Sequence, residues 1–135
     1  MDQPLADFLA AWDDDPKGVK PGLVRFIDAV SVLPGARIEF VSRPGVTHSL
    51  RATRDGLSPR PLFALADVVE DADGRFLSIC FYEDWVADPE ERGEPIPQGL
   101  LSEDARCFDY ESPDEAFMGY IADRLFEASQ ASLGG

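Results

Sequence analysis

Residues 61–85, PLFALADVVEDADGRFLSICFYEDW, decide the fold of this chain. Two runs of apolar, β-branched and aromatic residues flank a loop that ends in Asp73-Gly74. That dipeptide tolerates a positive φ and is typical of the tight turn in a β-hairpin. The stretch therefore predicts two antiparallel strands, around which the other elements can be placed.

A two-residue turn at Asp73-Gly74 sets the pairing of the two strands. One face of the hairpin is then apolar and buried, with Val68 opposite Ile79 and Ala66 opposite Phe81. The other face is mixed, with Asp67 opposite Cys80 and Leu65 opposite Tyr82. Such a mixed face indicates a sheet that is covered completely on one side only. A slip by one residue would exchange the two faces.

Amphipathic patterns predict two helices before the hairpin and one after it. Apolar residues repeat with helical spacing over residues 4–14 and 21–33. The third helix is expected to begin at Ser112, whose side chain can accept a hydrogen bond from the amide three residues on while Glu115 reaches back. The tail, residues 129–135, is expected to fray.

Three further stretches have strand character, at residues 36–42, 46–53 and 106–110. Residues 84–99, DWVADPEERGEPIPQG, are predicted to form a long acidic loop, and loops of this length are usually functional or mobile. Links of hairpin length join the strands, which favours antiparallel pairing. The sequence thus predicts one α+β domain over residues 1–135, an antiparallel sheet of about five strands with two N-terminal helices and one C-terminal helix.

Charge is the strongest feature of the composition, since the 135 residues carry a net charge of −14. This charge argues against nucleic acid as a partner, because such binding depends on cations that neutralise phosphates. Residues 37–60 differ, with five arginines against two acids. The excess of acid is either a solvated surface that keeps the protein soluble or a site for cations or a basic partner.

The sequence predicts a cytoplasmic protein. Its N-terminus lacks the basic and apolar regions of a signal peptide, and no apolar run reaches the length of a membrane span. Cys80 and Cys107 have no CxxC spacing and make no disulfide framework, so both are expected to be reduced. They are interpreted as small buried apolar residues that could face each other if their strands are neighbours.

Four segments carry a resemblance to a known family: GVTHSLRA at 45–52, RFLSICFYEDWVADPEE at 75–91, ARCFDY at 105–110 and ESPDEAFMGYIADRLFEA at 111–128. In these features the chain resembles the YdhG-like family of small, mostly uncharacterised bacterial α+β proteins, and more loosely the YjbR-like ones. Where that family commonly has a Trp-Gly-Met-Pro-like segment, this chain has VTHS at 46–49. The resemblance implies an antiparallel sheet with flanking helices. Since some relatives are proposed iron chaperones, it also implies iron handling as a candidate function.

Candidate metal ligands are the single histidine, His48, and the acids of the predicted loop. These acids are Glu83, Asp84, Asp88, Glu90, Glu91 and Glu94. One imidazole without a Cys/His cluster does not make a zinc site, and the acids do not follow the pattern of a calcium loop. A hydrogen-bonded core or edge histidine and a solvated loop are therefore the simpler interpretations, and no cofactor is predicted beyond a possible divalent cation.

Candidate partner contacts are Trp85 and the arginines of the first two strands. Trp85 either anchors the acidic loop on the sheet or belongs to a partner surface. Arg37, Arg43, Arg51 and Arg54 form either an exposed ion-pair ladder with Glu39 or an anion-binding patch.

No catalytic signature is present: the chain has no phosphate-binding glycine loop, Ser-His-Asp elbow or HExxH motif. The sequence therefore favours a non-enzymatic binding or interaction domain that contacts a protein partner or a second copy of itself. Iron or divalent-cation handling by surface carboxylates is the alternative. An enzyme that uses His48 would need a pocket with a converging acid or nucleophile.

Overall fold

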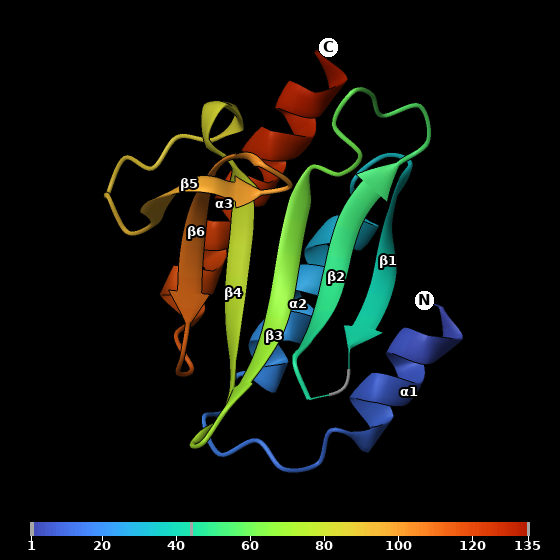
Figure 1. The fold of residues 1–135 in the computed structure, drawn as a ribbon, viewed down its shortest axis with the longest axis vertical. Helices are drawn as coiled ribbons and strands as arrows, with labels where there is room; N and C mark the ends of the chain where they lie inside the picture. The colour runs from blue at the N-terminus through green and yellow to red at the C-terminus, as the bar shows by residue number, and fades with distance from the viewer. Residues whose placement is uncertain (1, 44, 135) are drawn as a thin grey trace.

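The computed structural model describes residues 2–43 and 45–134, and three helices lie on one face of an antiparallel sheet (Figure 1). The helices are α1 (Gln3–Ala11), α2 (Lys20–Ser31) and α3 (Glu115–Leu133). The strands are β1 (Ala36–Arg43), β2 (Thr47–Arg54), β3 (Ala64–Asp71), β4 (Gly74–Tyr82), β5 (Glu94–Leu100) and β6 (Glu103–Tyr110), in the spatial order β1-β2-β3-β4-β6-β5. The predicted α+β class is confirmed, with six strands instead of about five.

The two N-terminal helices are set by aspartates. Asp2 caps α1 by accepting a hydrogen bond from the Leu5 amide at 2.8 Å. The carboxylate of Asp15 accepts from the amides of Val19 and Lys20 at 3.1 and 2.9 Å, which fixes the start of α2. The first helix ends at Ala11, earlier than predicted. Asp15, the last residue of the acidic run that follows, binds the amides at the start of α2 instead.

The central hairpin has the predicted faces but a different register. Ala66 pairs with Ile79 and Val68 pairs with Leu77, a shift of two residues from the predicted pairs. The turn lies one position earlier than expected, since Asp71 pairs with Gly74 and the Asp71 carboxylate accepts from the amide of Asp73 at 2.8 Å. A shift of two residues keeps every side chain on its face.

The predicted loop 84–99 is largely ordered. A short 3-10 helix, η1 (Glu83–Trp85), follows β4, and β5 supplies a sixth strand inside the segment. β5 contains Pro95 and Pro97 and pairs with β6 through an irregular register. Proline cannot donate to a neighbouring strand, so such a strand is restricted to the edge of a sheet. The opposite edge, β1, has eight residues and no proline.

The third helix begins and ends later than predicted. Its N-cap is Asp114, which accepts from the Phe117 amide at 2.9 Å, and not Ser112. The helix continues to Leu133, so the prediction of a frayed tail from residue 129 is wrong up to that point, because Ser129 is buried against the sheet. Gly135 lies outside the described residues.

Two apolar cores follow from this arrangement. The main core fills the space between the helices and the sheet, and a smaller one on the opposite face joins Leu62, Tyr82, Leu100 and Ala105. The remainder of that opposite face carries no helix (Figure 1), and we call it the open face. No helix within residues 2–43 and 45–134 combines the length and the apolar character needed to cross a membrane.

Candidate functional site

Three of the predicted partner-surface arginines share the open face. Successive side chains of a strand point to opposite faces of the sheet. The residues of β1 and β2 next to Arg37, Arg43 and Arg51 point toward the helices, so the three arginines point to the open face. Arg37 lies opposite Thr53, Arg43 opposite Thr47, and Arg51 opposite Glu39. The structure thus brings these arginines together on β1 and β2, and we call them the arginine patch.

Among the residues that the structure describes, two of the three arginines in the arginine patch are not neutralised by an ion pair. Arg37 lies 3.6 Å from Glu39 and 2.5 Å from Asp55, so part of the predicted ion-pair ladder exists. Within the described part of the chain, Arg43 and Arg51 form no ion pair. Six other arginines each form at least one: Arg37, Arg60, Arg75, Arg92, Arg106 and Arg124.

Arg51 is the least satisfied member of the patch. It is half-buried, and its Nε atom is buried without a hydrogen-bond partner among the described residues. The carboxylate that lies opposite it, Glu39, is engaged by Arg37. A guanidinium whose own carboxylate is engaged elsewhere can bind a carboxylate or phosphate of another molecule. Both anions offer two acceptor oxygens side by side, which match two of its N–H groups.

Arg54 does not belong to the patch, and the prediction that it contributes to a partner surface is wrong. It occupies the helix-facing phase of β2 and is only 8% exposed. Its guanidinium donates to Ser129, Ser132 and Pro34 and lies over the ring of Phe63, and burial lowers its pKa. A cation at the last turn of α3 is favourable because it faces the negative end of the helix dipole.

His48 also faces the helices, and it is buried. Its Nδ1 lies 2.7 Å from Ser42 Oγ and its Nε2 lies 3.0 Å from Glu70 Oε1. The ring packs against Phe8 of α1 with centroids 4.5 Å apart. Hydrogen bonds from His48 and Arg75 lower the pKa of Glu70. The structure therefore places His48 in a hydrogen-bonded core position, away from the loop acids with which it was predicted to bind metal.

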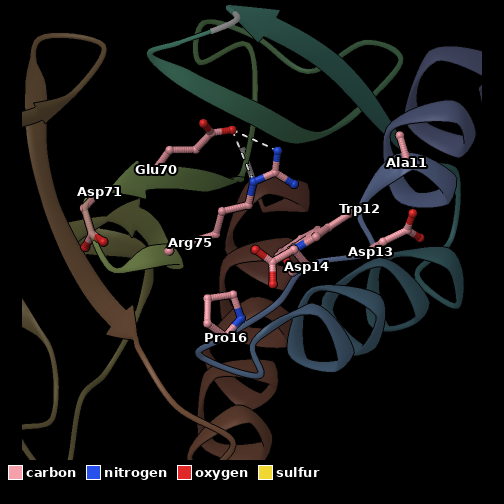
Figure 2. A pocket seen from close by; sticks show the side chains of 9 residues that line it. Ala11, Trp12, Asp13, Asp14, Pro16, Glu70, Asp71 and Arg75 are labelled. Carbon is pink, nitrogen blue, oxygen red and sulfur yellow. Dashed lines mark hydrogen bonds and ion pairs between the residues drawn. The ribbon is translucent and has the colours of Figure 1, made fainter.

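Beside His48 and Glu70 lies a hollow of about 260 Å³ between the end of α1 and the β3–β4 turn (Figure 2). Its walls include Trp12, Pro16, Glu70 and Arg75. Arg75 donates to Glu70 at 2.9 Å and covers the rings of Phe8 and Trp12. These contacts engage Glu70 and Arg75 with each other and with aromatic rings at α1, and so fasten α1 to the sheet.

Two of the predicted metal ligands, Glu83 and Asp88, both bind Arg106 instead. Arg106 lies 2.8 Å from Glu83 and 3.0 Å from Asp88. The side chain of Asp88 is 4% exposed and also accepts from the hydroxyl of Tyr120 and the amides of Arg92 and Gly93. This network holds the segment between η1 and β5 onto α3.

The remaining loop acids are dispersed. Asp84 binds Arg60, whereas Glu90, Glu91 and Glu94 are exposed. Among the residues that the structure describes, no three His, Cys, Asp or Glu side chains are grouped so that they could hold a metal ion. Binding of iron or another divalent cation by the surface carboxylates stays a prediction.

Trp85 lies at the junction of the two cores. Its ring meets that of Tyr82 edge-on at 5.2 Å, and the guanidinium of Arg60 lies 4.7 Å from its centroid. Hydrogen bonds to Glu103 and Asp84 raise the pKa of Arg60. The side chain is half-buried and anchors η1, so contact with a partner through Trp85 stays a prediction for its exposed part.

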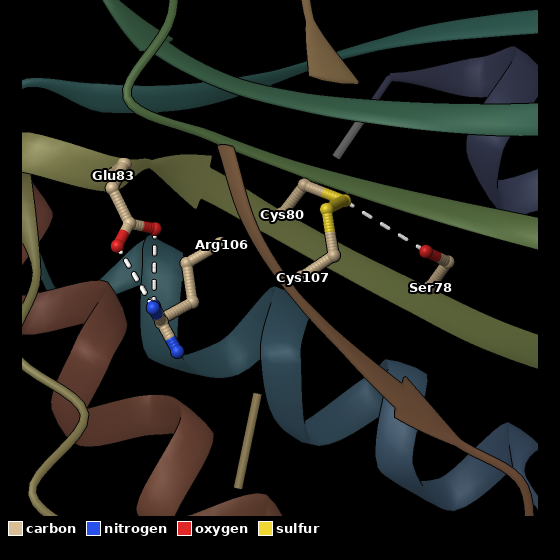
Figure 3. Close-up of a disulfide and its surroundings, with 5 residues drawn as sticks. All are labelled: Ser78, Cys80, Glu83, Arg106 and Cys107. Atoms are coloured by element: carbon tan, nitrogen blue, oxygen red, sulfur yellow. Dashed lines mark hydrogen bonds and ion pairs between the residues drawn. A yellow bond between two sulfur atoms is a disulfide. The ribbon is translucent and has the colours of Figure 1, made fainter. Parts of the chain in front are cut away.

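Cys80 and Cys107 form a disulfide, and the prediction of two reduced cysteines is wrong (Figure 3). They lie opposite each other on β4 and β6, with their Cα atoms 4.1 Å apart. The sequence indicated that the two cysteines could face each other if their strands were neighbours, but it did not show that β6 lies beside β4. That neighbourhood exists because β5 is added outside β6 at the edge.

The disulfide and His48 occupy opposite faces of the sheet, so the open face holds two separate features. One is the arginine patch on β1 and β2, which can bind anions. The other is the disulfide on β4 and β6, beside Ser78 and Asp109. Neither presents a nucleophile with an adjacent base.

Comparison with known proteins gives a partial likeness. No protein-family model matches the chain, and no solved structure matches it. Two curated proteins named probable malate:quinone oxidoreductase, from Mycobacterium sp. strains KMS and MCS, are each 32% identical to it over 107 residues. The match covers 79% of this chain and 19% of each relative, so the chain spans about a fifth of their length. The resemblance to YdhG-like proteins stays a prediction.

Proposed function

We propose that this chain is a non-enzymatic binding domain that recognises an acidic segment of another protein on the arginine patch. The observation that carries the proposal is that Arg43 and Arg51 are without ion pairs, among the described residues, in a chain where acids outnumber bases by 26 to 12. Because no carboxylate of the described residues pairs with these two arginines, their charge is available to a partner. A partner that brings its own carboxylates would satisfy them.

The chemistry of the patch favours carboxylates on an extended segment. Arginine binds a carboxylate through two parallel hydrogen bonds, and Arg43 on β1 and Arg51 on β2 lie on one face of the sheet, four residue positions apart along the paired strands. The surrounding acidic surface repels a uniformly negative partner at long range. Binding is therefore expected to be local, to depend on the arginines and to weaken with salt.

The mycobacterial relatives support an interaction role in a limited way. In them the similar sequence is a minor part of a much longer chain, as expected for a domain that works beside other protein parts. Association with an oxidoreductase of that kind is one form the proposed partner could take. Nucleic acid and membrane are not proposed as partners, and the proposed location is the cytoplasm.

A labelled peptide that carries a few glutamates among neutral residues tests the proposal by fluorescence anisotropy at low ionic strength. The wild type should bind, and the double variant Arg43→Glu/Arg51→Glu should bind at least about tenfold more weakly, since charge-assisted hydrogen bonds contribute about 1.5–3 kcal/mol each. The matched control is Arg25→Glu, which changes an exposed arginine of α2 that also lacks an ion pair among the described residues. This control should bind as the wild type does.

Two results would overturn the proposal. One is the absence of binding by the wild type at millimolar peptide. The other is a loss of binding free energy in Arg25→Glu that is half that of the double variant or more. The control removes half as much charge, so binding would then follow net charge and not the patch. Circular dichroism of each variant verifies that the fold is retained.

A further inference from the structure

The disulfide joins two strands that the sheet already holds together. β4 and β6 pair without interruption from Leu77 opposite Tyr110 to Tyr82 opposite Ala105, and the cysteines lie inside this ladder. Their neighbours in sequence, Ile79, Phe81 and Phe108, point into the main core and fix both strands from the other side. The position of the two sulfur atoms therefore does not depend on the bond between them.

The bond is accessible from the open face. It lines a hollow of about 370 Å³ whose polar walls include Asp67, Ser78, Glu94 and Asp109. Cys80 is 7% exposed, between Leu65 and Cys107, whereas Cys107 is half-buried and has only the edge strand beyond it. A small molecule that enters the hollow reaches the sulfur of Cys107 more readily than that of Cys80.

The hollow is acidic. Asp67, Glu94 and Asp109 contribute carboxylates, and one of them, Asp67, accepts a hydrogen bond from Ser49 at 2.5 Å. The one basic residue of its lining, Arg92, has its guanidinium over Phe117 and 3.8 Å from Asp114, so its charge is engaged toward α3. The approach to the disulfide thus favours molecules that are positively charged or neutral.

We infer that Cys80 and Cys107 are a thiol–disulfide exchange site that reacts with small cationic or neutral thiols in preference to anionic ones. A thiolate attacks Sγ of Cys107, the S–S bond breaks, and its electron pair leaves on Sγ of Cys80. Ser78 Oγ lies 3.7 Å from this sulfur and can donate to the departing thiolate. Cys107 is left in a mixed disulfide with the incoming thiol.

A second thiolate completes the exchange. It attacks the external sulfur of the mixed disulfide, releases the oxidised small-molecule disulfide and leaves Cys107 as a thiolate. Both cysteine thiolates then take protons from solvent. In sum, two small thiols are oxidised, and the cysteine pair gains two electrons and two protons; the reverse sequence restores the bond. The site is separate from the arginine patch, and neither inference depends on the other.

Three thiols of different charge test the inference on the oxidised, full-length protein: cysteamine, 2-mercaptoethanol and 2-mercaptoethanesulfonate. Reduction of the disulfide is followed by acid quench, alkylation and mass spectrometry. Each rate constant is expressed per thiolate and divided by the rate constant of the same thiolate with an uncharged small disulfide, because thiolates differ in nucleophilicity. The rate constant should be largest for the cationic cysteamine, smaller for the neutral thiol and smallest for the anionic sulfonate. The first and the last should differ roughly tenfold, as about 1.4 kcal/mol of charge interaction would produce. The first adduct should be on Cys107.

Charge variants at the hollow provide the control without altering a cysteine. Asp109→Asn should lower the ratio of the rate constant for cysteamine to that for the sulfonate. Asp123→Asn, which removes an exposed carboxylate from α3, should leave the ratio as in the wild type. Circular dichroism should show the same fold before and after reduction.

The inference is overturned by any of five results. The first three are two free thiols in protein isolated without reductant, reduction of the disulfide only in denaturant, and an equal ratio of rate constants in wild type and Asp109→Asn. The others are a first adduct on Cys80 and loss of the fold on reduction, which would show a structural bond.

Discussion

Asp88 shows at the scale of one residue how a predicted ligand becomes a structural anchor. Burial raises the pKa of its carboxyl, but hydrogen bonds from Tyr120, from the amides of Gly93 and Arg92, and from Arg106 outweigh burial and lower it to about 2. The folded state therefore prefers the ionised form more strongly than the unfolded chain does. This preference links the stability of the protein to pH.

Replacing Asp88 with Asn should remove that link. The folded pKa is about 2 and the ordinary value is 3.8, so the ionised carboxylate stabilises the fold above pH 3.8 and loses this effect as the pH falls through 2. Since one pKa unit corresponds to about 1.4 kcal/mol, we expect Asp88→Asn to lower the free energy of unfolding by about 2–3 kcal/mol at pH 7. Urea unfolding at several pH values measures this.

The control for Asp88→Asn is Asp123→Asn, an exposed position on α3. It should change stability by no more than about 0.5 kcal/mol, as is usual for surface substitutions. If Asp88→Asn loses stability between pH 4 and 2 as steeply as the wild type does, the interpretation of Asp88 is wrong.

At the scale of elements, Gly22 sets how closely α2 approaches the sheet. A Cβ atom at this position would lie 2.6 Å from Cε1 of Tyr110 and 3.1 Å from the terminal methyl of Met118. Tyr110 is itself held, because its hydroxyl accepts from the amide of Asp114 at the start of α3. One glycine therefore governs the contact between α2, β6 and α3.

Alanine at the two helical glycines should have opposite effects. Alanine in a helix is ordinarily more favourable than glycine by about 0.8–1.0 kcal/mol. Gly119→Ala should show this gain, because the nearest atom to its Cβ is a guanidinium nitrogen at 3.6 Å. Gly22→Ala should instead destabilise by about 1–3 kcal/mol through overpacking. Thermal and urea unfolding measure both; a stabilised Gly22→Ala would contradict the packing described.

The hairpin illustrates what could and could not be predicted for the elements. Alternation of apolar and polar residues identified the buried face, and Ala66, Val68, Ile79 and Phe81 are all fully buried. The register could not be predicted from alternation, because a shift of two residues preserves it. The carboxylate of Asp71 accepts from the amide of Asp73 in the turn, an Asx-turn contact that Asp73-Gly74 as the assumed turn left out.

The residues of the candidate sites also divide into those that could be predicted from the sequence and those that could not. Strand alternation groups Arg37 with Arg43 and places Arg51 on the matching face, so this part of the patch was predictable. The same alternation puts Arg54 with the buried Leu50 and Ala52, a signal that was present but not applied. The disulfide was not predictable, because it depends on β6 lying beside β4. The prolines of β5 made that strand look like part of a loop, so the strand order could not be derived.

At the scale of the whole molecule, solubility should follow net charge. With an isoelectric point near 4.2, the protein is strongly negative at pH 7 and uncharged near pH 4.2. We expect light scattering to rise toward that pH, since repulsion between molecules vanishes there. Arg43→Glu/Arg51→Glu should shift the maximum to lower pH. A maximum that stays in place for this variant would contradict a purely electrostatic cause.

The two edges of the sheet are unequal, and this inequality limits how copies of the protein can assemble. β5 is closed to a further strand by Pro95 and Pro97, whereas β1 presents eight residues without proline. Growth of a continuous sheet requires two open edges on every molecule. With one open edge, strand pairing between copies stops at a two-fold dimer, so the fold excludes fibre growth through its native sheet.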